Sequence, residues 1–305
     1  MTSKGRVSRI LHRLAFLFFA FLSSCNGQSC RQDNQIELYW LADSCVYSPE
    51  GYFWHNKEVQ ALPQNGDYIF AALDYSFEEK LLFVASKGNL AQYSDSKLLI
   101  FDPARNAVVQ QIKIQVMAPV SLSVSPAGKK IAIIGKSKSD SGSVLYCYLR
   151  DLGRLEIVAN GPFCDVSWDA SGDKVYVSTD MSVHEILEFD LSKDDHSPKI
   201  LADGIGVCGA KEPGTFFFVD RKARLWTGKA GCPTKSVSCN RNSLDEKYFS
   251  YLKYVRGSDD RLLVASFRVS SNEILLVNPT DGAICKVLDD CGAKDVVAWS
   301  RAQAQ

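Results

Sequence analysis

Ten cysteines are the side chains with the most chemistry in this sequence of 305 residues. Cys25 follows the apolar run 14–21, which comes after a segment with four Lys or Arg and no acidic residue. A basic segment, a short apolar stretch and then small residues is the order of a secretory signal. The apolar run is too short to span a bilayer, which takes about 20 apolar residues. We therefore expect export to an oxidising compartment, where disulfides persist.

The nine cysteines after Cys25 are then expected to form disulfides. Proximity suggests three pairs, and two of the remaining cysteines would form a fourth: Cys30 with Cys45, Cys232 with Cys239, Cys285 with Cys291, and Cys164 with Cys208. Cys147 lies in a strand-like run and is expected to be a small buried apolar residue. A metal site is not expected, because no cysteine pair has the two-residue spacing of zinc knuckles and the histidines are scattered.

The four residues 22–25, Leu-Ser-Ser-Cys, resemble the lipobox of bacterial lipoproteins. The resemblance implies that residues 1–24 are a signal peptide and that Cys25 becomes the acylated N-terminus through a thioether. Several acyl chains make such attachment permanent. The protein would lie in the bacterial cell envelope and face the periplasm, on the outer rather than the inner membrane. The alternative is an ordinary signal cleaved a few residues away, which leaves Cys25 discarded or free.

Charge restricts the expected partners. The sequence carries 35 basic and 35 acidic residues, and removal of residues 1–24 takes away four basic side chains and no acidic one. The mature chain is therefore mildly acidic. Nucleic-acid binding needs a clustered positive field, so no nucleic acid is expected as a partner. Because no polybasic patch is present, membrane contact is expected through the lipid anchor only.

Beyond residue 35 the sequence predicts short strands joined by turns. Residues 120–158 contain four strand-like runs, the first two separated by Ser-Pro-Ala-Gly at 125–128. The same plan recurs at 73–114, 164–201 and 252–288, and in degenerate form at 208–237. Turns near residues 76, 125, 169, 212, 258 and 300 repeat every 42 to 49 residues. A four-stranded unit with this period predicts a β-propeller blade.

The two ends of the chain complement each other. Residues 296–300 resemble a first strand with nothing after it, and residues 36–62 supply strands that lack a first strand. Because ring closure removes exposed sheet edges, we expect these ends to share one blade. The prediction is an all-β fold, a six-bladed β-propeller over residues 36–301 closed by N- and C-terminal strands, with seven blades as the alternative. Residues 25–35 are then a linker and residues 302–305 a tail.

The turns at 125–129 (SPAGK) and 169–174 (DASGDK) resemble the S-P-D-G-K turns of bacterial propellers. These include the propeller subunit of the Tol-Pal system and propellers with tyrosine-valine-threonine-asparagine-type repeats. The runs 98–103 (LLIFDP) and 274–279 (ILLVNP) are similar to the third strand of the latter. The resemblance extends over about residues 70–300 and implies the fold. These turns carry no catalytic residue.

Two functions fit this organisation. The first is a non-catalytic scaffold that binds an envelope protein or a cell-wall component, with no cofactor. The second is a propeller hydrolase or lactonase-like enzyme, a class that places acidic side chains around a divalent metal in the funnel. Asp165, Asp203 and Asp295 lie in or beside the connections between blades and are the candidate ligand-binding residues. The first function is preferred, because a fold does not imply chemistry and aspartates in such connections more often form turns.

Overall fold

The computed structural model of the protein describes residues 36–42, 50–55, 58–61, 69–76, 78–87, 96–136, 142–180, 182–222, 224–237, 249–254, 262–266, 273–279, 284–288 and 293–300. Within these ranges the chain forms strands β1 to β24 and one short 3-10 helix, η2 (Arg150–Leu152). No helix in these ranges is long and apolar enough to cross a membrane. Contacts group residues 32–305 into one compact unit.

The strands form four-stranded antiparallel sheets, which we number along the chain. Sheet 1 contains β4 (Ile69–Ser76), β5 (Leu81–Lys87), β6 (Ser96–Asp102) and β7 (Ala107–Ile114). Sheet 2 contains β8 (Met117–Val124), β9 (Lys130–Lys136), β10 (Ser143–Leu149) and β11 (Arg154–Gly161). Sheet 3 contains β12 (Phe163–Trp168), β13 (Lys174–Thr179), β14 (Glu185–Asp190) and β15 (Lys199–Asp203).

Two more sheets follow the same order and a third combines the ends of the unit. Sheet 4 contains β16 (Gly206–Gly209), β17 (Thr215–Val219), β18 (Leu225–Lys229) and β19 (Lys235–Ser236). Sheet 5 contains β20 (Phe249–Tyr254), β21 (Leu262–Ser266), β22 (Glu273–Val277) and β23 (Ile284–Leu288). The terminal sheet has the order β24 (Ala293–Ser300), β1 (Ile36–Ala42), β2 (Glu50–His55) and β3 (Glu58–Ala61). These sheets confirm the prediction of an all-β, propeller-like fold.

The predicted turns between first and second strands are present. Gly128 and Gly172 have φ angles of +71° and +74°, in the left-handed region that glycine adopts without steric cost. The Gly128 N–H donates to the Ser125 carbonyl at 2.8 Å, and the Gly172 N–H donates to the Asp169 carbonyl at 3.0 Å. These short turns join β8 to β9 and β12 to β13, so each second strand returns directly beside the first.

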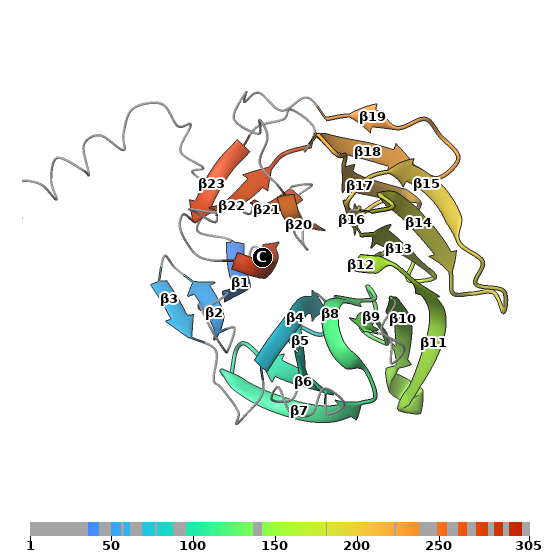
Figure 1. Ribbon diagram of the computed structural model, residues 1–305. Coiled ribbons are helices and arrows are strands. Elements are labelled where there is room, and N and C mark those ends of the chain that lie inside the picture. Colours follow the sequence, from blue (N-terminus) through green and yellow to red (C-terminus); the bar gives the residue numbers. More distant parts are fainter. Residues whose placement is uncertain are drawn as a thin grey trace, which may run out of the picture. The chain divides into compact units, whose positions relative to one another are not determined.

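The first strands of the sheets lie closest together, as Figure 1 shows. β4 contacts β8, β8 contacts β12, β12 contacts β16, β16 contacts β20, β20 contacts β24, and β24 contacts β4. The later strands of each sheet lie farther out, so that neighbouring sheets diverge from a shared centre (Figure 1). Side chains between neighbouring sheets must therefore fill a space that widens outward.

The apolar core consists of separate layers between neighbouring sheets. Between sheets 1 and 2 it includes Phe83, Ile100 and Leu122, which are almost fully buried. Between sheets 3 and 4 it contains a row of aromatic rings. Each fully buried side chain of this size contributes about 1.5–3 kcal/mol to folding. Burying both faces of a sheet in this way requires a neighbour on each side, which explains why the repeats are stacked.

Candidate functional site

Asp165 is the predicted site residue that lies near the shared centre. It is on the inner strand β12 and is 5% exposed. One carboxylate oxygen accepts from the Ser121 hydroxyl of β8 at 2.8 Å and from the Val166 N–H at 2.9 Å. Burial raises the pKa of the Asp165 carboxyl, and the positive charge of Lys253 and these hydrogen bonds oppose the increase. Its other oxygen, Oδ2, is buried without a hydrogen-bond partner among the described residues.

Lys253 brings a buried cation to this region. It lies on β20 of sheet 5 and is 5% exposed. Its ammonium donates to the Leu122 carbonyl on β8 of sheet 2 at 3.1 Å. A cation buried in this way requires a nearby negative charge or several acceptors. We call Ser121, Asp165 and Lys253 the central site, because together they connect inner strands of sheets 2, 3 and 5.

Other polar side chains of the inner strands also form bonds between sheets. Asp74 on β4 accepts from the Val124 N–H at 2.6 Å and from the Ser123 hydroxyl at 3.1 Å. The Ser123 hydroxyl oxygen in turn accepts from the Trp168 N–H at 3.3 Å. The Ser167 hydroxyl oxygen accepts from the Gly209 N–H at 2.9 Å. These bonds link β4, β8, β12 and β16 in series, so the buried polar groups hold the first strands together.

Sequence reasoning missed the serines and Lys253. The serines alternate with apolar residues in the first strands, as in Val-Ser-Leu-Ser-Val at 120–124 and Val-Ser-Trp at 166–168. That alternation predicts a strand, and it also places the hydroxyls on one face of each first strand, which is the signal that could have identified them. Lys253 gives no such signal, since a lysine is normally exposed and nothing in its neighbourhood distinguishes it.

The other two predicted aspartates do not join Asp165 among the described side chains. Asp203 ends β15, the outermost strand of sheet 3, and its side chain is 65% exposed and pairs with Arg221 at 3.1 Å. Since β12 and β15 are opposite edges of a four-stranded sheet, roughly 14 Å separates the two strands. The expectation that Asp203 faces the centre is corrected by this position. Asp295 lies on β24 with its Cα opposite Leu41, and its side chain lies outside the described residues.

Among the described residues there is no group of three or more His, Cys, Asp or Glu side chains that could hold a metal ion. Asp165 has Ser121 and Lys253 around it, and neither residue is a usual ligand for a divalent metal. The described part of the central site therefore consists of a buried carboxylate, a hydroxyl bonded to it and a buried ammonium.

The predicted Cys164–Cys208 disulfide is absent, because neither sulfur takes part in a disulfide. The Cys164 sulfur donates to the Thr179 carbonyl at 3.1 Å, while Cys208 packs with Phe217 and Leu225. The two side chains thus point into different surroundings although their strands are neighbours. Burial raises the pKa of the Cys164 thiol to about 11, which keeps it protonated and unreactive near neutral pH.

The remaining cysteine predictions have different outcomes. Cys147 is a buried free thiol in β10, which confirms its prediction as a small buried residue. Cys232 is an exposed free thiol, and its predicted partner Cys239 lies outside the described residues. The backbone of Cys285 is in β23, but its side chain is outside the described part. The other predicted cysteines also lie outside it: Cys25, Cys30, Cys45 and Cys291.

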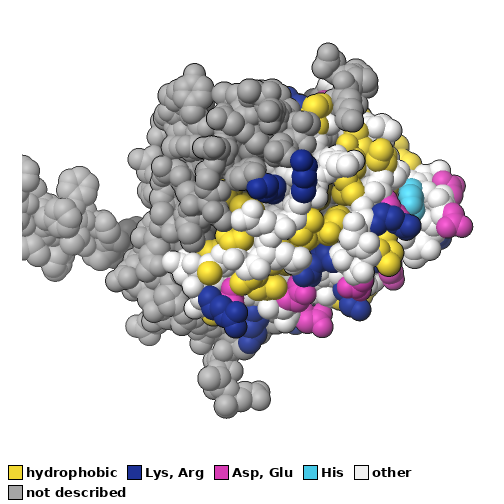
Figure 2. Space-filling view, turned by 90° about the horizontal axis from the view of Figure 1, so that it is seen from below, with side chains coloured by type: hydrophobic (Ala, Val, Ile, Leu, Met, Phe, Trp, Pro, Cys, Tyr) yellow, Lys and Arg dark blue, Asp and Glu magenta, His cyan; other side chains and the backbone are white. Residues whose placement is uncertain are grey.

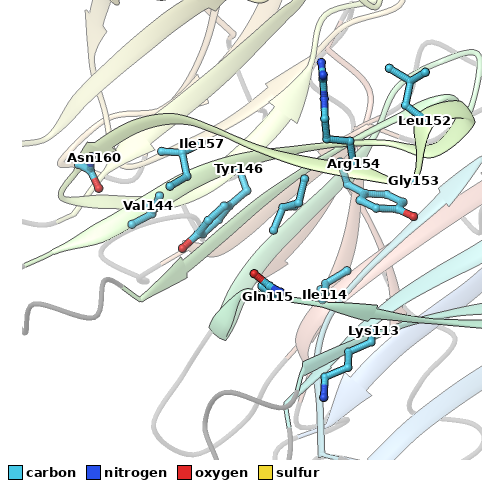
Figure 3. Close-up of a pocket in the computed structure, with 12 residues that line it drawn as sticks. Lys113, Ile114, Gln115, Val144, Tyr146, Leu152, Gly153, Arg154, Ile157 and Asn160 are labelled. Carbon is cyan, nitrogen blue, oxygen red and sulfur yellow. The ribbon is translucent and has the colours of Figure 1, made fainter.

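A second candidate site is a cleft between the outer parts of sheets 1 and 2, with a volume of about 820 Å³ (Figure 3). We call it the side cleft. Half-buried Tyr146 lies between Ile157 of β11 and the end of β7, at Ile114 and Gln115. Burial raises the pKa of the Tyr146 hydroxyl, so that this group stays neutral. The lining residues are Lys113, Ile114, Gln115, Val144, Tyr146, Tyr148, Leu152, Gly153, Arg154, Leu155, Ile157 and Asn160.

Comparison with known proteins identifies the fold. No protein-family model matches the chain, and no curated protein matches it. TolB from Acinetobacter baumannii has a similar structure, with a TM-score of 0.65 at 10% identity over 96% of this chain and 73% of that one. A putative TolB from Agrobacterium tumefaciens gives a TM-score of 0.60 at 13% identity over 88% and 98% of the two chains. A nidogen/laminin complex gives 0.60 at 10% identity over 86% and 98%. The chain therefore has a TolB-like β-propeller fold.

Proposed function

We propose that this protein is a non-catalytic propeller that binds another protein in the bacterial cell envelope. The observation that carries the proposal is that the polar side chains of the inner strands bind neighbouring sheets to one another. Asp74, Asp165 and the serines beside them form bonds between sheets. A catalytic carboxylate must reach a substrate, whereas these carboxylates are buried and each has an oxygen that is bonded to a neighbouring sheet. Such a centre is suited to a rigid support for binding surfaces on the outside.

We further propose that the propeller has six blades and is closed by its two ends. The pairing of β24 with β1 and the contact of β24 with β4 support this arrangement. Deleting residues 296–305 removes most of β24 and should lower both the melting temperature and the cooperativity of unfolding. An unchanged melting curve would overturn the closed ring. A deletion of residues 302–305, which leaves β24 intact, is the control.

The location of the protein is proposed from its first residues. Residues 1–24 would be removed as a signal peptide, and Cys25 would carry lipid that holds residues 36–301 on the periplasmic side, at the outer membrane. Mass spectrometry of the mature N-terminus should find an acylated Cys25. A Cys25→Ala variant that remained with the membrane fraction would overturn the lipid anchor.

A protein is the proposed partner because the fold occurs in a complex of two proteins, nidogen with laminin. The surface also supports this. Figure 2 shows hydrophobic side chains interspersed with charges of both signs over the described part of one face, without a field of one sign. This face therefore lacks the clustered positive charge that nucleic-acid binding needs, and its mixed character is compatible with a protein–protein contact.

Binding and metal-dependent catalysis can be distinguished with calcium. A metal enzyme using the predicted aspartates would gain thermal stability from Ca²⁺, because a ligand that binds only the folded state stabilises it. We expect no shift in melting temperature at millimolar Ca²⁺, for the wild type or for an Asp165→Asn/Asp203→Asn double variant. A calcium-dependent shift that the double variant loses would favour the hydrolase or lactonase-like function instead.

A further inference from the structure

The side cleft is a place where the packing between two sheets stops early. Its inner boundary is the closely packed layer that includes Tyr148, Ile114 and Leu122. Farther out, sheets 1 and 2 diverge, and the volume of about 820 Å³ between them is within the range of ligand pockets. At the corresponding place between sheets 3 and 4, Trp226 and Leu201 pack against the core. The interface between sheets 1 and 2 and the interface between sheets 3 and 4 therefore differ at this place.

Aliphatic side chains stand exposed beside the cleft. Leu152 and Ile157 line it and are 66% and 65% exposed, among the most exposed large apolar residues in the described part of the chain. The hydroxyls of Tyr146 and Tyr148 and the amides of Gln115 and Asn160 add polar groups, so that the lining is of mixed character. Figure 3 shows Tyr146 among these residues. A cleft that combines exposed aliphatic side chains with polar groups can hold an apolar side chain in a defined orientation.

The strand that borders the cleft is also a sheet edge. β11 is the outermost strand of sheet 2, so one side of its backbone has no neighbouring strand in the sheet. A peptide in extended conformation can add to such an edge and direct alternate side chains into pockets beside it. β11 has eight residues and carries a bulge opposite Leu145 and Tyr146, which limits the length of a regular added strand.

The charges of the cleft are of one sign. Among the described residues that line it, the charged ones are Lys113 and Arg154, which stand on opposite sides, with side chains that lead away from the floor (Figure 3). Arg154 also pairs with Glu156 of the same strand. Because both side chains lead away from the floor, their charges would meet a ligand at its ends rather than at its middle. Acidic residues flanking an apolar one complement this arrangement.

We propose that the side cleft binds an extended, acidic segment of a partner protein. One apolar side chain of the segment enters between Tyr146 and Ile157, its backbone lies along β11, and its acidic residues approach Lys113 and Arg154. A glycan fits less well, because Tyr148 is only 7% exposed and offers no open ring face for a sugar to stack on. The inference rests on the proposed function in one respect only, that the partner is a protein.

The test is selection of peptides of about 12 residues from a random library displayed on phage, using residues 36–305 or the full chain. Selected peptides should be rich in acidic and aliphatic residues. Their affinity should fall about tenfold or more for Ile157→Asp, which puts a charge into the apolar contact, and a few-fold for Arg154→Glu. Ile200→Asp is the matched control, because Ile200 is a 62% exposed isoleucine on the outermost strand of sheet 3, and it should leave affinity unchanged.

The pairing of the peptide backbone with β11 can be tested separately. N-methylation of alternate peptide amides on the side that faces β11 should abolish binding, while methylation of the other alternate amides should not. The proposal is overturned if no peptide is selected, if Ile157→Asp and the wild type bind equally, or if a soluble peptidoglycan fragment binds the cleft in place of peptides. Because the selection uses purified protein, its outcome does not depend on the lipid anchor or on the envelope location.

Discussion

Two interfaces between neighbouring sheets are built on the same plan and packed differently. Between sheets 3 and 4, Tyr176, Phe216, Phe218 and Trp226 form a continuous row with ring centroids 5.1, 5.8 and 6.2 Å apart. Between sheets 1 and 2, the second strand β9 supplies Ile131 and Ile133 in place of two phenylalanines. Larger rings fill a space that widens outward, whereas isoleucines fill only its inner part. Residue size on the second strand thus distinguishes the closed interface from the one that retains a cleft.

The largest expected effect follows from removing one ring of the aromatic row. Phe216 is 2% exposed and contacts rings on both sides, so Phe216→Ala should lower the free energy of unfolding by about 3–5 kcal/mol. Tyr146→Ala, beside the open cleft, should cost about 1 kcal/mol, because little packing is lost there. Urea denaturation of both variants measures the difference. Equal losses would show that the two interfaces are packed equally well.

The closed interface also contains a buried carboxylate. Asp169 is 1% exposed and accepts from the Tyr176 hydroxyl at 3.0 Å and from the Gly214 N–H of sheet 4 at 2.7 Å. Burial alone would raise the pKa of Asp169, but the hydrogen bonds from Ser171, Gly214 and Tyr176 lower it overall. A carboxyl whose pKa is lower in the folded state stabilises the fold above its unfolded pKa, and that contribution is lost as the pH falls through the folded pKa.

Asp169→Asn should therefore cost about 2 kcal/mol at pH 7, because an amide presents a donor where the carboxylate accepts only. The loss should stay constant down to about pH 5 and shrink below about pH 4, as the wild-type carboxyl takes up a proton. Urea titrations between pH 3 and 7 measure it. A Tyr146→Phe variant, which changes a hydroxyl at the open cleft, should show no such pH dependence. A loss that does not change with pH would contradict the claim that the ionised carboxylate of Asp169 stabilises the fold.

A smaller effect is expected from the hydroxyl that faces this carboxylate. Tyr176→Phe removes the donor at 3.0 Å but keeps the ring in contact with Phe216. Since Asp169 retains its backbone donors from Gly214 and Ser171, the loss should be about 1–2 kcal/mol. Thermal melting measures it. A loss as large as that of Phe216→Ala would mean that the hydrogen bond, and not the ring packing, closes this interface.

The sequence was sufficient for the repeating pattern and insufficient for the contacts between repeats. The turns at Gly128 and Gly172 could be predicted because a short turn between paired strands needs a residue at positive φ. The side cleft could not be predicted, since it depends on which side chains of two distant segments meet. The pairing of Cys164 with Cys208, predicted for two cysteines left over from the pairs chosen by proximity, was wrong because the direction of each thiol is set by its own strand.

The smallest expected effect concerns the rim of the open cleft. Ile157 and Ile200 are both exposed isoleucines on outermost strands, so replacing either with Asp should change the free energy of unfolding by less than about 0.5 kcal/mol. Urea denaturation of both variants tests this pair. If Ile157→Asp cost more than about 1 kcal/mol while Ile200→Asp did not, Ile157 would belong to the packing between sheets 1 and 2. The cleft would then be part of the core, and the contrast between the two interfaces would be one of degree.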